Sequence, residues 1–274
     1  MIRSSIAAAV AAVTFCVAGA ASAQFATKVI SYDEGVAPSP GFTIPVAALG
    51  GPQGDTSFGP VTPFNPPFST SDIVSIGEGG QITLRLSNFI LPQAGEVELG
   101  IFANVGIVDT DFPNGQAGVG PTFSTFGPAF SGMPEDAAEV SVSEDGITWV
   151  SLTNQIFDIP TAGFQDVAAT LPADFTKPFI GVLDDFEGLS LAQMLTLLDG
   201  SAGGTWLDIS ATGLSQVGFV RLSLADDLDP GTSLNFDLDA VTISSSAIGA
   251  RAPEPTSLLL LAIGGIGTVN RRRR

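Results

Sequence analysis

Short apolar or alternating runs, separated at close intervals by glycine, proline or aspartate, make up the middle of this chain. Of its 274 residues, 32 are Gly and 19 are Pro, and these residues interrupt regular structure too often for long helices. The runs between them are rich in β-branched and aromatic residues and several alternate with period two, which is typical of strands. We therefore predict a body that is mainly β-structure.

The positions of these runs favour a β-sandwich, because many short strands with turn signals between them suit two packed sheets. One segment differs: in 189–198 apolar residues recur at helical spacing and Asp199-Gly200 ends the run, so we predict one short helix packed on the sandwich. The predicted strands are 28–32, 73–76, 81–86, 96–103, 138–143, 147–152, 165–170, 206–210, 217–224 and 235–244.

The sequence also predicts one hairpin turn and two long loops. The clearest hairpin joins the strands on either side of Glu144-Asp145-Gly146, which has turn chemistry. Two long segments, 38–67 and 109–134, hold many Gly and Pro together with several Phe residues, and loops of this length in compact domains are functional or disordered. We expect the Phe side chains of the first loop to lie against the body.

The N-terminal segment 1–23 has the layout of a secretory signal peptide. Arg3 provides the positively charged n-region, residues 6–19 form the apolar region, and Ala21-Ser22-Ala23 provides the small residues of a cleavage site. The apolar run is shorter than the ~20 residues of a spanning helix, so we predict export with cleavage before Gln24. Cys16, the single cysteine of the chain, lies in this segment, so the mature chain has no disulfide or cysteine metal site.

The C-terminal segment 251–274 combines three features in order. Pro253, Glu254 and Pro255 interrupt regular structure, the apolar run 258–267 partitions into lipid, and a basic cluster stays in the cytoplasm by the positive-inside rule. The body then lies outside the inner membrane, and an ordinary C-terminal membrane anchor is the alternative. The basic cluster consists of Arg271, Arg272, Arg273 and Arg274.

Read with the signal peptide, this end resembles the PEP-CTERM sorting signal of exported bacterial proteins. The resemblance implies transient anchoring in the inner membrane by a C-terminal helix and processing near Pro253 to Pro255 by an enzyme of the exosortase type. It also implies delivery to the cell surface or the extracellular matrix. The predicted organisation is a signal peptide with an N-terminal signal helix, 1–23; a β-sandwich domain, 24–250; and a sorting signal, 251–274.

The predicted mature body is strongly acidic. Six of the ten Lys and Arg residues lie in the terminal segments, whereas Glu254 is the one acidic residue among 28 that does. Residues 24–250 therefore hold four basic and 27 acidic residues, a formal charge of −23. This charge argues against a nucleic-acid partner, which requires Lys and Arg clusters. The chain has no His, which excludes Ser-His-Asp catalysis and histidine zinc sites.

Parts of the body resemble known proteins. Segments 47–52, 61–67, 74–84 and 236–241 are similar to surface proteins that carry this sorting signal. The hairpin 140–149 and the strand 219–222 resemble discoidin-type, galactose-binding-like jelly rolls. The resemblance implies a jelly-roll sandwich and offers carbohydrate binding as one function.

Asp237 and Asp239 alternate with Phe236 and Leu238 in the last predicted strand, so both carboxylates lie on one face. Jelly-roll carbohydrate-binding domains, which this region resembles, hold a structural calcium with an acidic residue of the last strand and groups near the first. The resemblance implies calcium bound by Asp239 and Asp237 with Asp33. Solvated strand charges are the alternative that the acidic composition favours. Asp226, Asp227 and Asp229 precede Pro230-Gly231 and predict either a calcium-binding turn or, without a metal, a turn with Asx hydrogen bonds.

We expect no catalysis, and a structural or adhesive role at the cell surface. A carbohydrate-binding module for extracellular polysaccharide is the second hypothesis, and exposure of Trp149, Trp206 or loop Phe side chains in a groove would favour it. A glycan hydrolase is the third, and it requires two carboxylates that face each other across a cleft.

Overall fold

The computed structural model describes residues 24–56, 58–127, 138–152, 155–225 and 235–251. The predicted signal helix, the sorting residues Pro253 to Pro255 with the arginines, and Asp226 to Asp229 lie outside these ranges. Within them, no helix has the length and apolar character that crossing a membrane requires.

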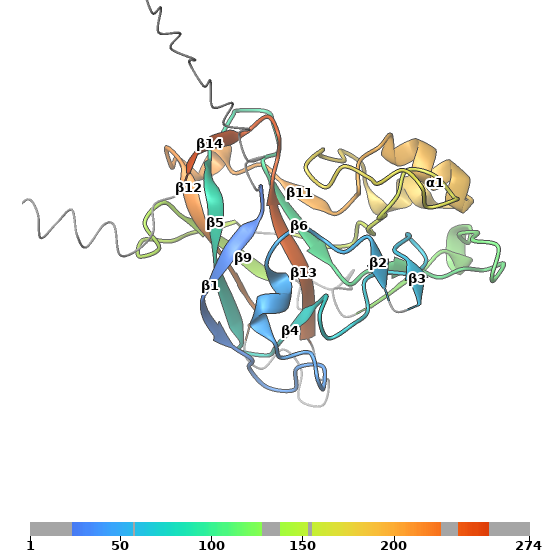
Figure 1. The fold of residues 1–274 in the computed structure, drawn as a ribbon, viewed down its shortest axis with the longest axis horizontal. Helices are drawn as coiled ribbons and strands as arrows, with labels where there is room; N and C mark the ends of the chain where they lie inside the picture. The colour runs from blue at the N-terminus through green and yellow to red at the C-terminus, as the bar shows by residue number, and fades with distance from the viewer. Residues whose placement is uncertain (1–23, 57, 128–137, 153–154, 226–234, 252–274) are drawn as a thin grey trace, which may run out of the picture.

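Two antiparallel sheets form the body (Figure 1). The larger has the order β1-β5-β12-β9-β10, with β14 also paired to β5, and the smaller has the order β11-β6-β13-β4. The larger sheet comprises β1 (Ala26–Asp33), β5 (Gln81–Ile90), β9 (Glu139–Ser143), β10 (Val150–Leu152), β12 (Val217–Ser223) and β14 (Ile248–Arg251). The smaller comprises β4 (Val74–Gly77), β6 (Leu99–Ala103), β11 (Thr205–Leu207) and β13 (Asn235–Ile243). The prediction of a mainly β body is confirmed.

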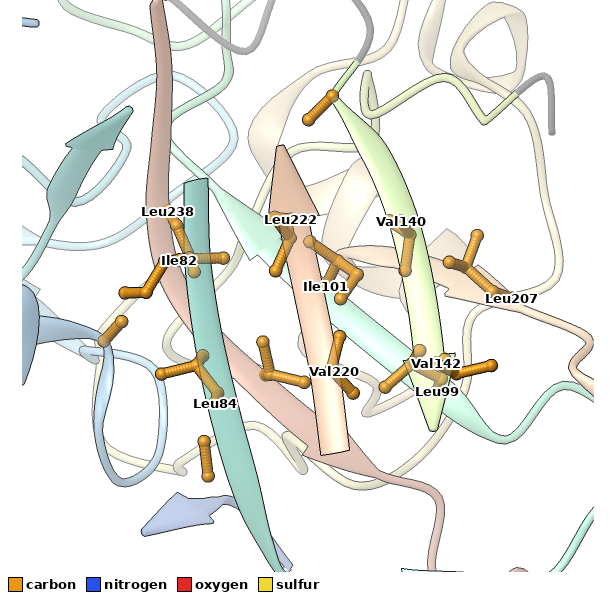
Figure 2. Close-up of a cluster of buried hydrophobic side chains, with 14 of the residues drawn as sticks. Ile82, Leu84, Leu99, Ile101, Val140, Val142, Leu207, Val220, Leu222 and Leu238 are labelled. Atoms are coloured by element: carbon orange, nitrogen blue, oxygen red, sulfur yellow. The ribbon is translucent and has the colours of Figure 1, made fainter. Parts of the chain in front are cut away.

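The core lies between the two sheets because alternate residues of each strand point inward (Figure 2). Each fully buried Leu, Ile or Val contributes roughly 1.5–3 kcal/mol relative to exposure, so this layer is the main source of stability. The larger sheet supplies Ile82, Leu84, Val140, Val142, Val220 and Leu222, and the smaller supplies Leu99, Ile101, Leu207 and Leu238.

A lobe of loops extends from the outer face of the smaller sheet (Figure 1). It contains α1 (Leu191–Leu198), where Ser190 N–H donates to Gln193 Oε1 at 2.9 Å and Asp199 ends the helix in the left-handed region with φ 47°. Two short hairpins, β2 (Asp55–Thr56) with β3 (Gly59–Pro60) and β7 (Gly106–Ile107) with β8 (Thr125–Phe126), complete its regular pairing. Short 3-10 turns occupy Pro45–Ala48, Gly120–Thr122, Leu183–Phe186 and Ser210–Thr212.

The predicted helix is confirmed, but its packing partner differs from the expectation. Met194, Leu195 and Leu198 pack into an apolar cluster with Ile107 of β7 and Phe186 of a 3-10 turn, both in the lobe. The helical spacing identified the apolar face of α1 correctly but contained no information about which element covers that face.

The hairpin prediction is confirmed and one strand prediction is wrong. Val142 of β9 pairs with Val150 of β10, and Asp145 Oδ1 accepts from the N–H groups of Ile147 and Thr148, both at 2.8 Å. Segment 165–170 forms a turn instead of a strand. There Asp166 Oδ1 accepts from Thr170 N–H at 3.0 Å, and such a local carboxylate bond competes with strand pairing.

Candidate functional site

A pocket of about 300 Å³ lies where the outer face of the smaller sheet meets the loops of the lobe. Its size is at the lower end of the range for small-ligand sites. Its lining is mainly apolar and includes Val97, Asp158, Phe179, Ile180, Thr205 and Trp206.

The indole of Trp206 is a fixed wall of this pocket. Trp206 pairs with Gly100 of β6, where an added Cβ would lie 3.0 Å from the indole, so the glycine lets the ring lie across the strand. Trp206 Nε1 donates to Gly203 O at 2.9 Å, and the ring meets Phe102 edge to face at 6.3 Å. With 8% of its surface exposed, Trp206 belongs to both the pocket wall and the packing beneath it.

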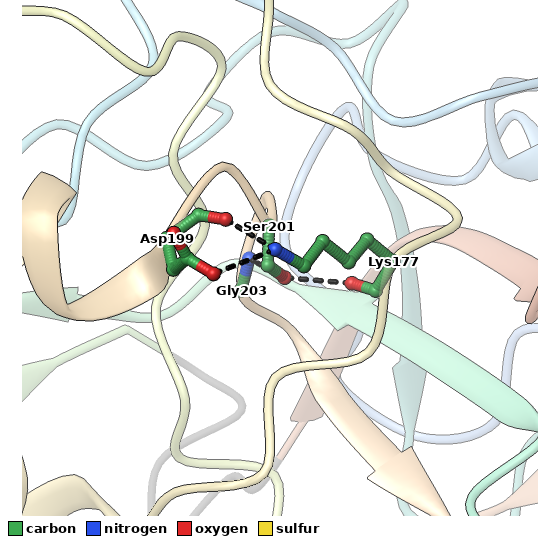
Figure 3. Close-up of polar contacts among 4 residues, drawn as sticks. All are labelled: Lys177, Asp199, Ser201 and Gly203. Carbon is green, nitrogen blue, oxygen red and sulfur yellow. Dashed lines mark hydrogen bonds and ion pairs between the residues drawn. The ribbon is translucent and has the colours of Figure 1, made fainter.

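A polar network fixes the backbone around Gly203, which positions Trp206 (Figure 3). Ser201 Oγ donates to Lys177 O at 2.7 Å and accepts from Gly203 N–H at 3.1 Å. Lys177 Nζ donates to Asp199 O and pairs with Asp199 Oδ2 at 2.9 Å, at the end of α1. The network therefore connects α1 and segment 174–177 to the backbone that bonds Trp206.

Asp158 is the one carboxylate among the pocket lining residues. Desolvation raises its pKa, and the negative charge of Asp184 raises it further. The rim is strongly apolar, since Ile156, Ile180 and Val182 are 55%, 81% and 61% exposed. The pocket can thus offer a hydrogen-bonding carboxyl beside aromatic and aliphatic surface. Of the lining residues, Trp206 alone was a candidate from the sequence, because most of the others lie in loops without a recognisable motif.

The structure places Asp237 and Asp239 on the outer face of β13, opposite to Phe236 and Leu238, which lie in the core. Asp237 Oδ2 accepts from Ser39 Oγ at 3.3 Å, and Asp239 Oδ2 accepts from Gln53 N–H at 3.3 Å. Asp239 Oδ1 is buried and has no hydrogen-bond partner. The predicted common face is correct, but the two carboxylates have separate partners.

Both carboxylates are buried, which corrects the expectation that they are solvated. Asp237 is 3% and Asp239 is 1% exposed, because the loops around Ser39 and Gln53 cover the sheet face. Desolvation raises the pKa of Asp237, and it raises the pKa of Asp239 well above its ordinary value with a further contribution from Asp72.

Asp33, the third residue of the predicted calcium site, is exposed at the end of β1. Its Oδ1 accepts from Gly35 N–H at 3.2 Å in a local turn. Among the described residues, no three acidic side chains are arranged to hold a metal. Calcium binding stays a prediction.

Phenylalanines within and directly after the first long loop form a cluster at the surface. The Phe42 and Phe58 rings both meet that of Phe68, at centroid distances of 5.8 and 6.2 Å. Phe58 and Phe68 are 73% and 51% exposed. The expectation that all Phe residues of this loop lie against the body holds for Phe64, which packs beside α1, and is wrong for these two. Phe130 of the second loop lies outside the described residues.

The C-terminal segment matches the family model described as the PEP-CTERM protein-sorting motif, over residues 251–274. This match confirms the predicted sorting signal and indicates an exported surface protein that is sorted by an exosortase. No curated protein matches the chain. Arg251 is both the first residue of the motif and the last of β14, so the motif begins directly where the larger sheet ends.

Proposed function

We propose that this protein is a non-catalytic adhesion or structural protein of the cell surface or extracellular matrix. The exposed cluster of Phe42, Phe58 and Phe68 carries the proposal. Three neighbouring phenylalanines at the surface are costly in water, and exposed apolar patches mark interaction sites. The sorting motif supports it as well, because it brings this patch to the compartment where polymers and other surface proteins are available.

The body is proposed to be a jelly roll of the galactose-binding-like type. Two antiparallel sheets with interleaved strand orders support this assignment. We propose no catalytic role.

The adhesion proposal is tested by replacing two exposed rings with serine. The native processed protein, its F58S/F68S variant and an F112S control are incubated with extracellular polymer isolated from the producing cells. Phe112 is 84% exposed and has no ring partner among the described residues, so its replacement removes apolar surface outside the cluster. We expect the double variant to lose at least about tenfold in bound fraction while the control binds normally. Equal binding of all three contradicts the proposal.

Carbohydrate binding is the second candidate, and the pocket favours it. Sugar rings bind through aromatic faces and a few placed polar groups, and the pocket combines Trp206 and Phe179 with the Asp158 carboxyl and Thr205. A glycan array with the wild type and an Asp158→Asn variant tests this candidate. Hits that weaken in the variant support it, and an array without hits contradicts it.

A further inference from the structure

The few cations of the body are concentrated on one surface. Three of the four basic residues in 24–250 point to the outer face of the larger sheet: Lys28 and Arg221, and Arg85, which is buried with 5% exposed. Lys28 of β1 is directly opposite Arg85 of β5. Arg221 of β12 is opposite Thr83 of β5, and Thr83 is two residues from Arg85.

Arg221 is held in a fixed orientation. Its guanidinium lies 4.0 Å from the centroid of the Trp149 ring, and its Nε donates to Thr83 Oγ1 at 3.2 Å. Stacking on an aromatic ring and a bond through Nε leave the two terminal nitrogens of an arginine for a planar anion. Trp149 is half-buried on this outer face.

Two of these cations, Lys28 and Arg221, are not neutralised by acids of the described residues. No carboxylate of the described residues forms an ion pair with Lys28 or Arg221, although the body holds 27 acidic residues. Asp33 and Glu139 lie on the same face, in the row beyond Arg221. The fourth cation of the body, Lys177, pairs with Asp199 in the lobe. The outer face of the larger sheet is thus where this acidic molecule can accept an anion.

Hydroxyl groups flank Arg221 on both sides. The register places Ser31, Thr83, Arg221, Ser141 and Ser151 in one row across β1, β5, β12, β9 and β10. Ser31 and Ser151 are exposed, and Ser151 Oγ lies 3.0 Å from Ser141 Oγ. Thr83 and Ser141, the neighbours of Arg221 in this row, are buried, with 2% and 7% exposed. A guanidinium on an indole provides a carboxylate fork, and the exposed serines at the two ends of the row provide donors and acceptors for sugar hydroxyls.

We propose that this face, centred on Arg221 and Trp149, binds a carboxylated sugar unit of an acidic polysaccharide. The guanidinium binds the carboxylate and Lys28 adds positive charge. The exposed serines each lie two strands from Arg221, about 10 Å away, and bond hydroxyls of the neighbouring sugar units. The inference deepens the proposed adhesive function by naming a polymer class, and it uses a surface separate from the Phe cluster and the pocket.

The test is fluorescence titration of the native processed protein carrying Trp206→Phe. The chain has two Trp residues, so this variant reports on Trp149 alone. The probes are a galacturonate oligomer, a neutral galactose oligomer of equal length, and polyglutamate. We expect the galacturonate oligomer to change Trp149 emission and to bind at least about tenfold more tightly than the neutral one.

Matched charge variants identify the binding group. R221A should weaken galacturonate binding at least about tenfold, and R221K should weaken it as well because lysine lacks the planar fork. K177A removes the same charge from the lobe and should change the affinity less than about twofold. Equal effects of R221A and K177A, or no emission change with galacturonate, overturn the inference. Polyglutamate binding as tightly as galacturonate would assign the face to acidic peptides and overturn it too.

Salt dependence adds an independent criterion. The body carries −23 charges that repel a polyanion over a Debye length of about 30 Å at 0.01 M salt but about 8 Å at 0.15 M. A local contact at Arg221 should therefore strengthen as salt is raised over this range, and steady weakening would overturn it. Failure here is distinguishable from failure of the adhesion proposal. If the wild type binds the native polymer and R221A binds it equally, only this inference is lost.

Discussion

The two outer faces of the sandwich are covered to different extents. The face of the smaller sheet is covered by loops, so that Phe102, Asp239 and Trp206 are buried beneath the lobe. The outer face of the larger sheet retains a partly exposed polar surface with Arg221 and exposed Ser151. The difference teaches that a sheet face without contact to the central core can become a second interior when long loops return to it. The experiments below test that difference, beginning with the largest effect.

Truncation of Phe102 should have the largest effect. Its ring is fully buried on the outer face of β6 and meets Phe175 at 5.9 Å and Trp206 at 6.3 Å. Phe102→Ala should lower the free energy of unfolding by about 3–5 kcal/mol, as for a central core residue. Denaturant unfolding measures this, with Trp149→Ala on the other face as the control, for which we expect about 1 kcal/mol. Equal losses would show that the two faces do not differ.

Removal of the Ser201 hydroxyl should have an intermediate effect. This side chain is 2% exposed and bonds both Lys177 O and Gly203 N–H. Ser201→Ala leaves the buried Gly203 N–H without its acceptor, so we expect a loss of about 1–3 kcal/mol in unfolding free energy. Ser151→Ala on the exposed face is the matched control, with an expected change within about 0.5 kcal/mol. A cost below that of the control would mean that the covered face tolerates unpaired groups.

Local periodicity and turn residues in the sequence were sufficient to predict which face of a strand a residue lies on and where a hairpin turns. Alternation assigned Phe236 and Leu238 to one face of β13 and the carboxylates to the other, and turn chemistry located the hairpin at Asp145. Periodicity contains no information about what covers the other face. The burial of Asp239 and the pocket at Trp206 depend on loop segments that contact the sheet from far along the chain, such as Gln53. Strand β14, which is short and contains Gly249, had no recognisable pattern.

The covered face should also produce a pH dependence. A carboxyl whose folded pKa lies above its unfolded value of 3.8, as for Asp237 and Asp239, binds its proton more tightly in the folded state. The free energy of unfolding should therefore increase as the pH falls from neutral towards the unfolded pKa, by at most about 1.4 kcal/mol per pH unit per proton. Asp109 and Asp166 have lowered pKa values, so their contribution is lost at still lower pH.

Thermal unfolding of the wild type and Asp239→Asn from pH 7 to pH 5 measures this dependence. The variant should show a shallower slope, because Asn has no proton to bind. An identical slope contradicts the role of Asp239. Calcium that raises the unfolding temperature of the wild type but not of the variant would instead establish the predicted calcium site.

The smallest effect should come from the ion pair at the edge of the lobe. Lys177 and Asp199 are 2.9 Å apart, but their side chains are 44% and 90% exposed, so solvent screens the attraction. Lys177→Ala should therefore lower the unfolding free energy by no more than about 0.5 kcal/mol, although it removes the ion pair of the network around Ser201. Chemical denaturation of K177A, S201A and the double variant separates the two contributions. A loss in K177A as large as that in S201A would show that the charge at the surface, and not the buried hydroxyl, fixes the lobe to the sheet.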